Sequence, residues 1–157
     1  MLVIYIMESD LPNSVLRFQP GSNICVMAFD FGETRIGVAV GNTLLKIPHP
    51  LSTITGHNKF DKFAKIAKLI ATWQPSLLVV GMPTNLDNDK QLLINSITRF
   101  RNRLQHNFKL PVDFINEDYT SSTAGAQLLE QGINGVKQKH KLDGLAACAI
   151  LQAFFRD

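Results

Sequence analysis

The sequence has little cysteine and no long apolar run. Two cysteines occur among 157 residues, Cys25 and Cys148, and both stand between apolar neighbours. We interpret them as buried free thiols in a reducing compartment. Neither they nor the four scattered histidines have the spacing of a zinc site. The apolar run at residues 1–7 is too short to span a membrane and has no preceding basic residue, so it is a poor signal peptide. We therefore expect a cytoplasmic protein.

Charged residues are also scarce, at 18% of the chain against 45% apolar residues. This balance is typical of a globular protein and excludes a disordered one. The net charge of +3 and the pI near 9.0 mildly favour an anionic partner, although an ordinary protein on the basic side fits equally well. A chain of 157 residues is long enough for one domain but too short for two α/β domains around a cleft.

The first half of the chain predicts an extension followed by a β-meander. Residues 1–22 lack sustained periodicity, and we interpret them as an N-terminal extension of a single domain at residues 23–157. The apolar run from Ile24 to Phe29 predicts a strand that is covered on both faces. A turn at residues 31–34, an antiparallel second strand at 35–40 and a third strand within 44–54 follow.

Helices and strands then alternate. A helix is expected up to Trp73, with Phe60, Phe63, Ala64, Ala67, Ile70 and Trp73 on its inner face. We next expect a strand at 77–80, a loop at 82–88 and a helix that is capped by Asp89 and has an inner stripe of Leu93, Ile97, Phe100 and Leu104. The remaining elements are a strand at 112–115, a helix at 120–131, a loop at 132–140 and a helix at 141–155. This order predicts an α/β fold: a mixed five-stranded sheet, its first three strands antiparallel, with helices on both faces.

Three carboxylates stand beside strongly apolar segments, namely Asp30, Glu117 and Asp143. Singly, each has an ordinary explanation: turn chemistry for Asp30, surface exposure for Glu117 and the helix dipole for Asp143. Together they are candidate ligands, because the strand order can bring the ends of the first and last strands to the start of the final helix. Oxygen ligands without cysteine or histidine favour Mg²⁺ or Mn²⁺, and a pair of such ions is suited to phosphodiester cleavage.

Basic residues flank these carboxylates in the sequence. Arg35, Lys137, Lys139 and Lys141 are candidates for contacts with the phosphate backbone of a nucleic acid, contacts that position a strand without reading its sequence. A solvated basic loop is the alternative for residues 137–141. Arg99, Arg101 and Arg103 add charge to a predicted helix but alternate along it, so they cannot all lie on one face.

Residues 24–157 resemble the YqgF, or RuvX, family of Holliday junction resolvases and nucleases that mature the precursor of small-subunit ribosomal RNA. The resemblance is carried by four segments, at residues 27–39, 80–83, 116–121 and 142–152. It implies a ribonuclease H-like fold, a metal-dependent nuclease site with Asp30, Glu117 and Asp143 as the acidic triad, and either a monomer or a homodimer.

One motif departs from the family pattern. The family carries Asp-Glu-Arg where this chain has Asn116-Glu117-Asp118, so an arginine is lost and a carboxylate is gained beside the expected site. Asp118 therefore either weakens substrate binding or joins the metal ligands.

We expect a metal-dependent endonuclease that processes the 5′ end of pre-16S rRNA in ribosome biogenesis. Three alternatives stay open: a Holliday junction resolvase in DNA recombination and repair, a nucleic-acid-binding module that does not cut, and a nucleotide-binding protein of the actin and sugar-kinase type. The last is based on residues 30–34, which are similar to a phosphate loop, but it requires two such domains.

Overall fold

The computed structural model describes residues 22–83, 90–116 and 135–156, with side chains from Leu142 onward in the last range. The predicted helix at 120–131 and nearly all of the predicted extension at 1–22 lie outside the described residues. None of the helices in the described ranges combines the length and the hydrophobicity that a membrane span requires.

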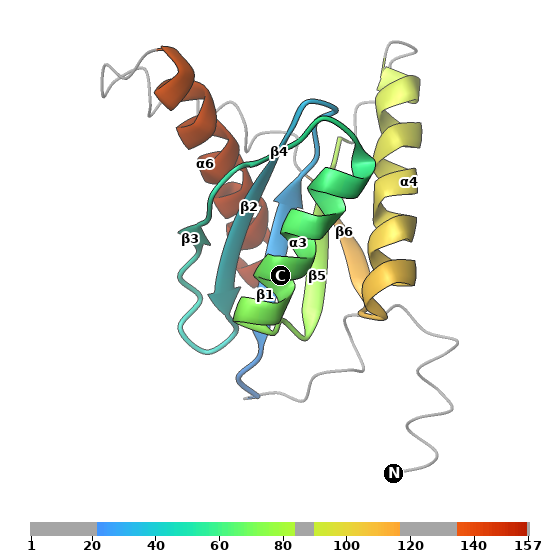
Figure 1. The fold of residues 1–157 in the computed structure, drawn as a ribbon. Helices are drawn as coiled ribbons and strands as arrows, with labels where there is room; N and C mark the ends of the chain where they lie inside the picture. The colour runs from blue at the N-terminus through green and yellow to red at the C-terminus, as the bar shows by residue number, and fades with distance from the viewer. Residues whose placement is uncertain (1–21, 84–89, 117–134, 157) are drawn as a thin grey trace.

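A mixed sheet forms the centre of the protein, in the order β3-β2-β1-β5-β6, with the short β4 also paired to β2 (Figure 1). Its strands are β1 (Cys25–Asp30), β2 (Arg35–Asn42), β3 (His49–Pro50), β4 (Ile54–Thr55), β5 (Leu77–Met82) and β6 (Val112–Asn116). β2 is antiparallel to β1, whereas β5 is parallel to both β1 and β6. The predicted mixed sheet with an antiparallel start is thus confirmed.

The predicted third strand is divided into β3 and β4, so the sheet has six strands and not five within the described residues. Pro50 pairs with Ala39 of β2 at the end of β3. Leu51 still donates to the carbonyl oxygen of Val38 at 2.8 Å, and the strand pairing with β2 resumes at Ile54.

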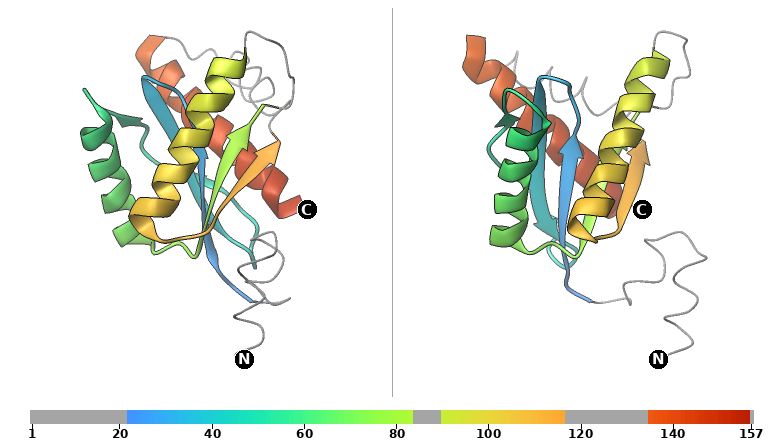
Figure 2. Two further views of the ribbon diagram at one scale, coloured as in Figure 1. Left: turned by 90° about the vertical axis from the view of Figure 1, so that its right-hand side faces the viewer. Right: turned by 45° about the vertical axis from the view of Figure 1, so that its right-hand side comes forward.

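Helices cover both faces of the sheet (Figure 2). α3 (Lys59–Trp73) and α4 (Gln91–Phe108) lie on one face, and α6 (Gly135–Arg156) lies on the other. Side chains of β1 alternate between the two cores: Met27 and Phe29 belong to the α3/α4 core, and Val26 and Ala28 to the α6 core. The continuous apolar run of β1 is therefore explained by burial on both faces.

The inner face of α3 differs from the predicted one. Its buried centre is Ile66, with Phe63, Leu69 and Ile70 packed beside it. Phe60 is 86% exposed and Trp73 is 44% exposed, and Ala64 and Ala67 are also exposed. The predicted stripe was therefore wrong at four of its six positions, including Ala64 and Ala67 in the middle of the helix, and of the six only Phe63 and Ile70 pack against the core.

The predicted buried stripe of α4 is confirmed in the middle of the helix but is wrong at its start. Ile97, Phe100 and Leu104 are buried, but Leu93 is 39% exposed. The N-cap residue is Lys90, which makes no side-chain capping bond, and Asp89, the predicted cap, lies outside the described residues.

The final helix begins at Gly135, so the prediction of a loop over 132–140 is wrong for residues 135–140. Lysine and glutamine are good helix formers, and no proline interrupts this stretch, so its high charge does not prevent a helix. Asp143 consequently lies in the third turn of α6 and not in the first. The helix dipole, which acts within the first turn, does not explain a carboxylate at that position.

Both cysteines are free, as predicted, but they are half-buried and not fully buried. Burial raises the pKa of the Cys148 thiol to about 11 and raises that of Cys25 as well. Both thiols therefore stay protonated, and poorly nucleophilic, near neutral pH.

Candidate functional site

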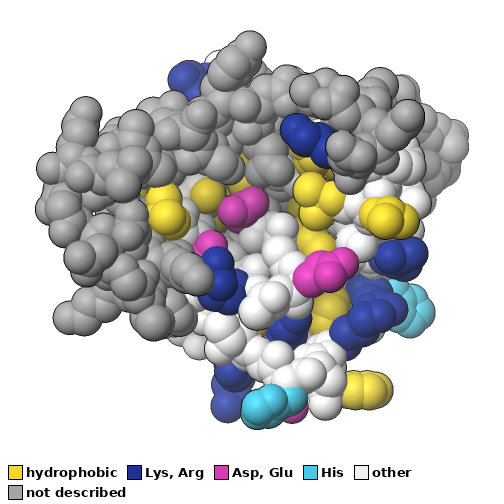
Figure 3. Space-filling view, turned by 90° about the horizontal axis from the view of Figure 1, so that it is seen from above, with side chains coloured by type: hydrophobic (Ala, Val, Ile, Leu, Met, Phe, Trp, Pro, Cys, Tyr) yellow, Lys and Arg dark blue, Asp and Glu magenta, His cyan; other side chains and the backbone are white. Residues whose placement is uncertain are grey.

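The carboxyl ends of three strands meet at one edge of the sheet. β1, β5 and β6 are mutually parallel in the order of the sheet, so Asp30 at the end of β1 and Asn116 at the end of β6 lie at this same edge. Glu117 follows Asn116 directly but lies outside the described residues. Seen from above, acidic side chains lie among lysine and arginine side chains on the described part of this face (Figure 3). In open α/β sheets, this edge is where ligands commonly bind.

The strand alternation directs Asp30 toward α6. Ala28, two residues earlier in β1, packs in the α6 core, and residues two apart share a face. On β2, Ala39 packs in the same core, so Arg35 and Gly37 share that face. Asp30 is the direct cross-strand partner of Gly37. Asp30, Arg35 and Gly37 therefore form one group on the face that α6 covers.

Gly37 brings α6 into contact with the sheet beside Asp30. A Cβ atom built on Gly37 would lie 2.0 Å from the carbonyl oxygen of Asp143 and 3.1 Å from its Cα. Only a residue without a side chain allows this approach. Directly opposed residues of antiparallel strands lie about 4.5–5.5 Å apart at Cα. Gly37 is therefore close to the backbone of Asp30 within the sheet and to the backbone of Asp143 in α6. The backbones of two of the three predicted site residues are thus close together.

Arg35 is part of this group through an ion pair. Its Nε donates to Oδ2 of Asp143 at 2.8 Å, and the two side chains are 33% and 18% exposed. A charge-assisted bond of this length is stronger than a neutral one, and partial burial reduces its screening. The bond fixes the direction of the Asp143 carboxylate. It uses one of the five N–H donors of the guanidinium group.

The predicted lysines lie on α6 and not on a loop. Lys137, Lys139 and Lys141 belong to the first two turns of the helix. Positions 137 and 141 are one turn apart and share a helix face, whereas position 139 lies on another.

The donor chemistry around Asp30 and Asp143 fits a hard divalent cation. Both side chains offer carboxylate oxygens, which Mg²⁺ and Mn²⁺ prefer. In the described ranges no group of three or more His, Cys, Asp or Glu side chains could hold a metal ion. The third predicted ligand, Glu117, is outside those ranges.

Two features of this region were missed by sequence reasoning. Gly37 interrupts an otherwise apolar β-strand, and an isolated glycine in a strand is a signal of close backbone approach. Arg99 and Arg103 are four residues apart, so they share a face of α4 and line a pocket next to Phe31. Arg101 points elsewhere: it donates to the carbonyl of Val112. The prediction that the three arginines cannot all lie on one face of the helix is confirmed, and Arg99 and Arg103 share a face.

The mixed sheet with its antiparallel start and the helices on both faces are those of a ribonuclease H-like fold. The fold is similar to that of Thermus thermophilus RuvC in complex with a Holliday junction substrate, with a TM-score of 0.53, 14% identity and coverage of 85% of this chain and 94% of that one. The family model of RuvX, described as Holliday junction resolvase, matches residues 24–157, and the chain belongs to this family. The resemblance stated from the motifs is thereby confirmed.

Relatives of similar length carry one name. The chain is 52% identical over 130 residues to a protein of Chromobacterium violaceum, covering 82% of this chain and 95% of the relative. It is 48% identical over 131 residues to a protein of Methylobacillus flagellatus, covering 83% and 90%. Each relative is named "Putative pre-16S rRNA nuclease".

Proposed function

We propose that this protein is a metal-dependent endonuclease that hydrolyses phosphodiester bonds at the 5′ end of pre-16S rRNA during ribosome biogenesis. The observation that carries the proposal is the contact of Gly37 with Asp143 directly across from Asp30, at the edge of the sheet where the parallel strands end. The names of the RuvX relatives support the reaction and the substrate. Such a substrate places the protein in the cytoplasm, and the family match supports a single domain at residues 23–157 after an extension at 1–22.

Asp30, Glu117 and Asp143 are the proposed ligands of two Mg²⁺ or Mn²⁺ ions. The chemistry that such ions supply when bound is activation of a water molecule and stabilisation of the leaving oxygen. The chain itself contributes oxygen donors of the right type, and Arg35 keeps the carboxylate of Asp143 in one orientation through its 2.8 Å bond. Gly37 keeps the backbone of Asp143 close to Asp30.

A four-way DNA junction is the second candidate substrate. The description of the RuvX family and the junction bound to the similar RuvC structure favour it. Both substrates present the same phosphodiester bond to the same carboxylates. Because Asn116 and Asp118 depart from the family motif, a third hypothesis is a nucleic-acid-binding module that does not cut.

The test is cleavage of two labelled substrates, a precursor RNA that spans the 5′ end of 16S rRNA and a synthetic four-way DNA junction. Each is incubated with Mg²⁺ or Mn²⁺ and either the wild-type protein or Asp143→Asn. We expect the RNA to be cut by the wild type and not by the variant. Cutting of the junction alone would transfer the assignment to resolvase activity, and retained binding without any cutting would reject the nuclease.

Arg35 gives a prediction that separates two roles. If it acts by orienting Asp143, Arg35→Gln lowers kcat/KM by about 10–100-fold, as for other partners that orient metal ligands, and the Kd for RNA changes little. If it contacts a phosphate, the Kd rises and the slope of log Kd against log salt falls by nearly one unit. We expect the first result because the structure pairs Arg35 with Asp143. Single-turnover cleavage and filter binding at several salt concentrations measure both quantities.

The lysines at the start of α6 give a second prediction. Replacing Lys137, Lys139 and Lys141 together by glutamine weakens RNA binding and reduces the salt slope by up to about 2–3 units, since each lost phosphate contact removes about 0.7–0.9. Because positions 137 and 141 share a helix face, the double variant at these two positions is expected to account for most of the change. An unchanged slope in the triple variant would mean that this turn of α6 is only solvated.

A further inference from the structure

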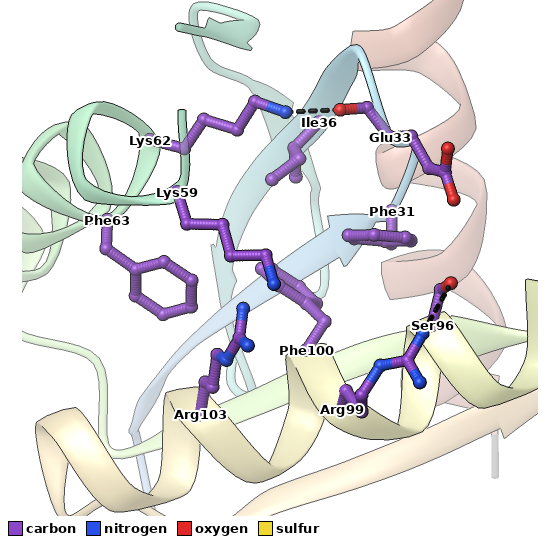
Figure 4. A pocket seen from close by; sticks show the side chains of 10 residues that line it. All are labelled: Phe31, Glu33, Ile36, Lys59, Lys62, Phe63, Ser96, Arg99, Phe100 and Arg103. Atoms are coloured by element: carbon purple, nitrogen blue, oxygen red, sulfur yellow. Dashed lines mark hydrogen bonds between the residues drawn. The ribbon is translucent and has the colours of Figure 1, made fainter. Parts of the chain in front are cut away.

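A cationic pocket with an aromatic floor lies between α3 and α4, on the opposite face of the sheet from α6. Its volume is about 300 Å³, at the lower end of the range of roughly 300–1,000 Å³ for small-molecule sites. We refer to it as the α3–α4 pocket. It is lined by Phe31, Glu33, Ile36, Lys59, Lys62, Phe63, Ser96, Arg99, Phe100 and Arg103 (Figure 4).

The floor of the pocket offers aromatic surface to a flat ligand. The ring of Phe100 is buried and supports Phe31 and Phe63, whose centroids lie 4.9 Å and 5.9 Å from its own. Phe31 and Phe63 are only partly buried, so parts of their rings face the cavity. Partly exposed phenylalanine rings that are held in place by a buried one are suited to stacking with a nucleobase.

The rim of the pocket carries four cations against one carboxylate. Lys59 and Lys62 come from α3, Arg99 and Arg103 come from α4, and Glu33 is the single acidic residue of the lining. The ends of Lys59 and Arg103 point toward one another across the floor (Figure 4). Like charges that converge in this way repel, and a bound anion removes the repulsion.

Among the described residues, no ion pair joins a rim cation to a carboxylate, and the ion pair described above joins Arg35 to Asp143. Lys62 donates to the carbonyl oxygen of Glu33, and Arg99 donates to Oγ of Ser96 at 3.3 Å. These are neutral acceptors, so the positive charge of the rim is retained. The ligand that complements the pocket has an anionic group and a flat apolar part, which is the chemistry of a nucleotide.

The pocket adjoins the proposed cleavage site. Phe31 and Glu33 belong to the turn that follows Asp30, so the same turn borders the carboxylate cluster and the pocket. Because the carboxylates lie on the α6 face and the pocket on the α3/α4 face, a strand with a phosphodiester at Asp30 reaches the pocket by crossing the edge of the sheet at residues 31–34. An acidic peptide would satisfy the rim but not the aromatic floor.

We propose that the α3–α4 pocket binds one unpaired nucleotide of the substrate strand, with its base on Phe31 and Phe63 and its phosphate held by Arg99 and Arg103. The inference rests on the proposed nuclease function and adds to it a site for a single-stranded nucleotide beside the cleavage point. Substrates with an unpaired segment next to the cut are consequently preferred over fully paired ones.

The experiment measures binding without cleavage. Fluorescence anisotropy of a labelled single-stranded RNA of five nucleotides is followed in EDTA at several salt concentrations, with the full chain. The test variant is Arg99→Gln with Arg103→Gln. The matched control is Lys109→Gln with Arg156→Gln, which changes the charge equally at exposed C-terminal ends of α4 and α6.

We expect the test variant to bind about tenfold or more weakly, the usual scale for a lost hydrogen bond to a charged group. The salt slope should fall by about 1.4, which is about 0.7 for each lost contact with a single strand. The control should bind like the wild type. Equal binding by test and control variants would overturn the proposal.

Two competitors identify the ligand. Free AMP should displace the RNA only at much higher concentration, and a peptide of glutamates should displace it less well than AMP. Displacement by AMP at the concentration of the RNA itself would overturn the assignment to a strand, and displacement by the peptide alone would overturn the assignment to a nucleotide. If the protein does not cut but shows this binding pattern, the cleavage function is rejected and the nucleotide site is retained. If the protein cuts but both variants bind RNA equally, the nucleotide site is rejected and the cleavage function is retained.

Discussion

Asp30→Asn is expected to abolish metal-dependent cleavage while the protein stays folded. The change removes a charge from the proposed ligand set with almost no change in side-chain volume. Loss of an outer partner of a metal ligand already costs about 10–100-fold, so loss of a ligand should lower kcat/KM by more than about 100-fold. The measurement is cleavage of the preferred substrate in Mg²⁺, under single-turnover conditions.

The matched control is Asp61→Asn, the same replacement at an exposed carboxylate in the first turn of α3. It should cost a few tenths of a kcal/mol to about 1 kcal/mol in stability through the helix dipole and leave cleavage unchanged. A second measurement separates loss of metal from loss of fold: Mn²⁺ should raise the Tm of the wild type and of Asp61→Asn but not that of Asp30→Asn. Full activity of Asp30→Asn in Mg²⁺ would remove Asp30 from the site.

The position of Asp30 could be predicted because two independent patterns converge on it. The apolar run before it predicts a strand that is buried on both faces, and both cores are found where the alternation of β1 puts them. A carboxylate at the end of such a strand lies at the edge where parallel strands end. Local hydrophobicity and one topological rule are sufficient for this inference.

The environment of Asp143 could not be predicted in the same way. Its neighbours Arg35 and Gly37 are more than 100 residues away in the sequence, and neither periodicity nor charge indicates that they meet. The start of α6 was missed for a related reason, since a run of lysines is compatible with both a helix and a loop until packing decides. The same holds for the α3–α4 pocket, whose cations come from two helices that only the tertiary fold brings together.

Gly37→Ala is expected to reduce both stability and cleavage. The added Cβ would lie 2.0 Å from the Asp143 carbonyl oxygen and 2.6 Å from the carbonyl carbon. Because these are backbone atoms in the middle of a helix, no side-chain rotation relieves the overlap, and α6 must move away from β2. Overpacking of this kind costs about 1–3 kcal/mol or more, which urea denaturation can measure as a lower midpoint.

The same displacement moves the Asp143 carboxylate away from Asp30, and a shift of about 1 Å at a reacting centre can cost about 100-fold in rate. Gly144→Ala is the matched control on the neighbouring residue, where the new Cβ would meet the Pro50 Cβ at 3.1 Å and the Leu51 carbonyl oxygen at 3.9 Å, and the helix gains about 1 kcal/mol of propensity. We expect this control to stay within about 1 kcal/mol of the wild type and to cut normally.

A Gly37→Ala protein that melts and cuts like the wild type would show that α6 does not lie on β2 at Gly37. A protein that is destabilised yet cuts normally would show that the contact holds the fold together without positioning Asp143 for catalysis. If the variant loses more cleavage activity than its unfolded fraction explains, then Gly37 is required for the position of Asp143 in the site, because no side chain larger than hydrogen fits there.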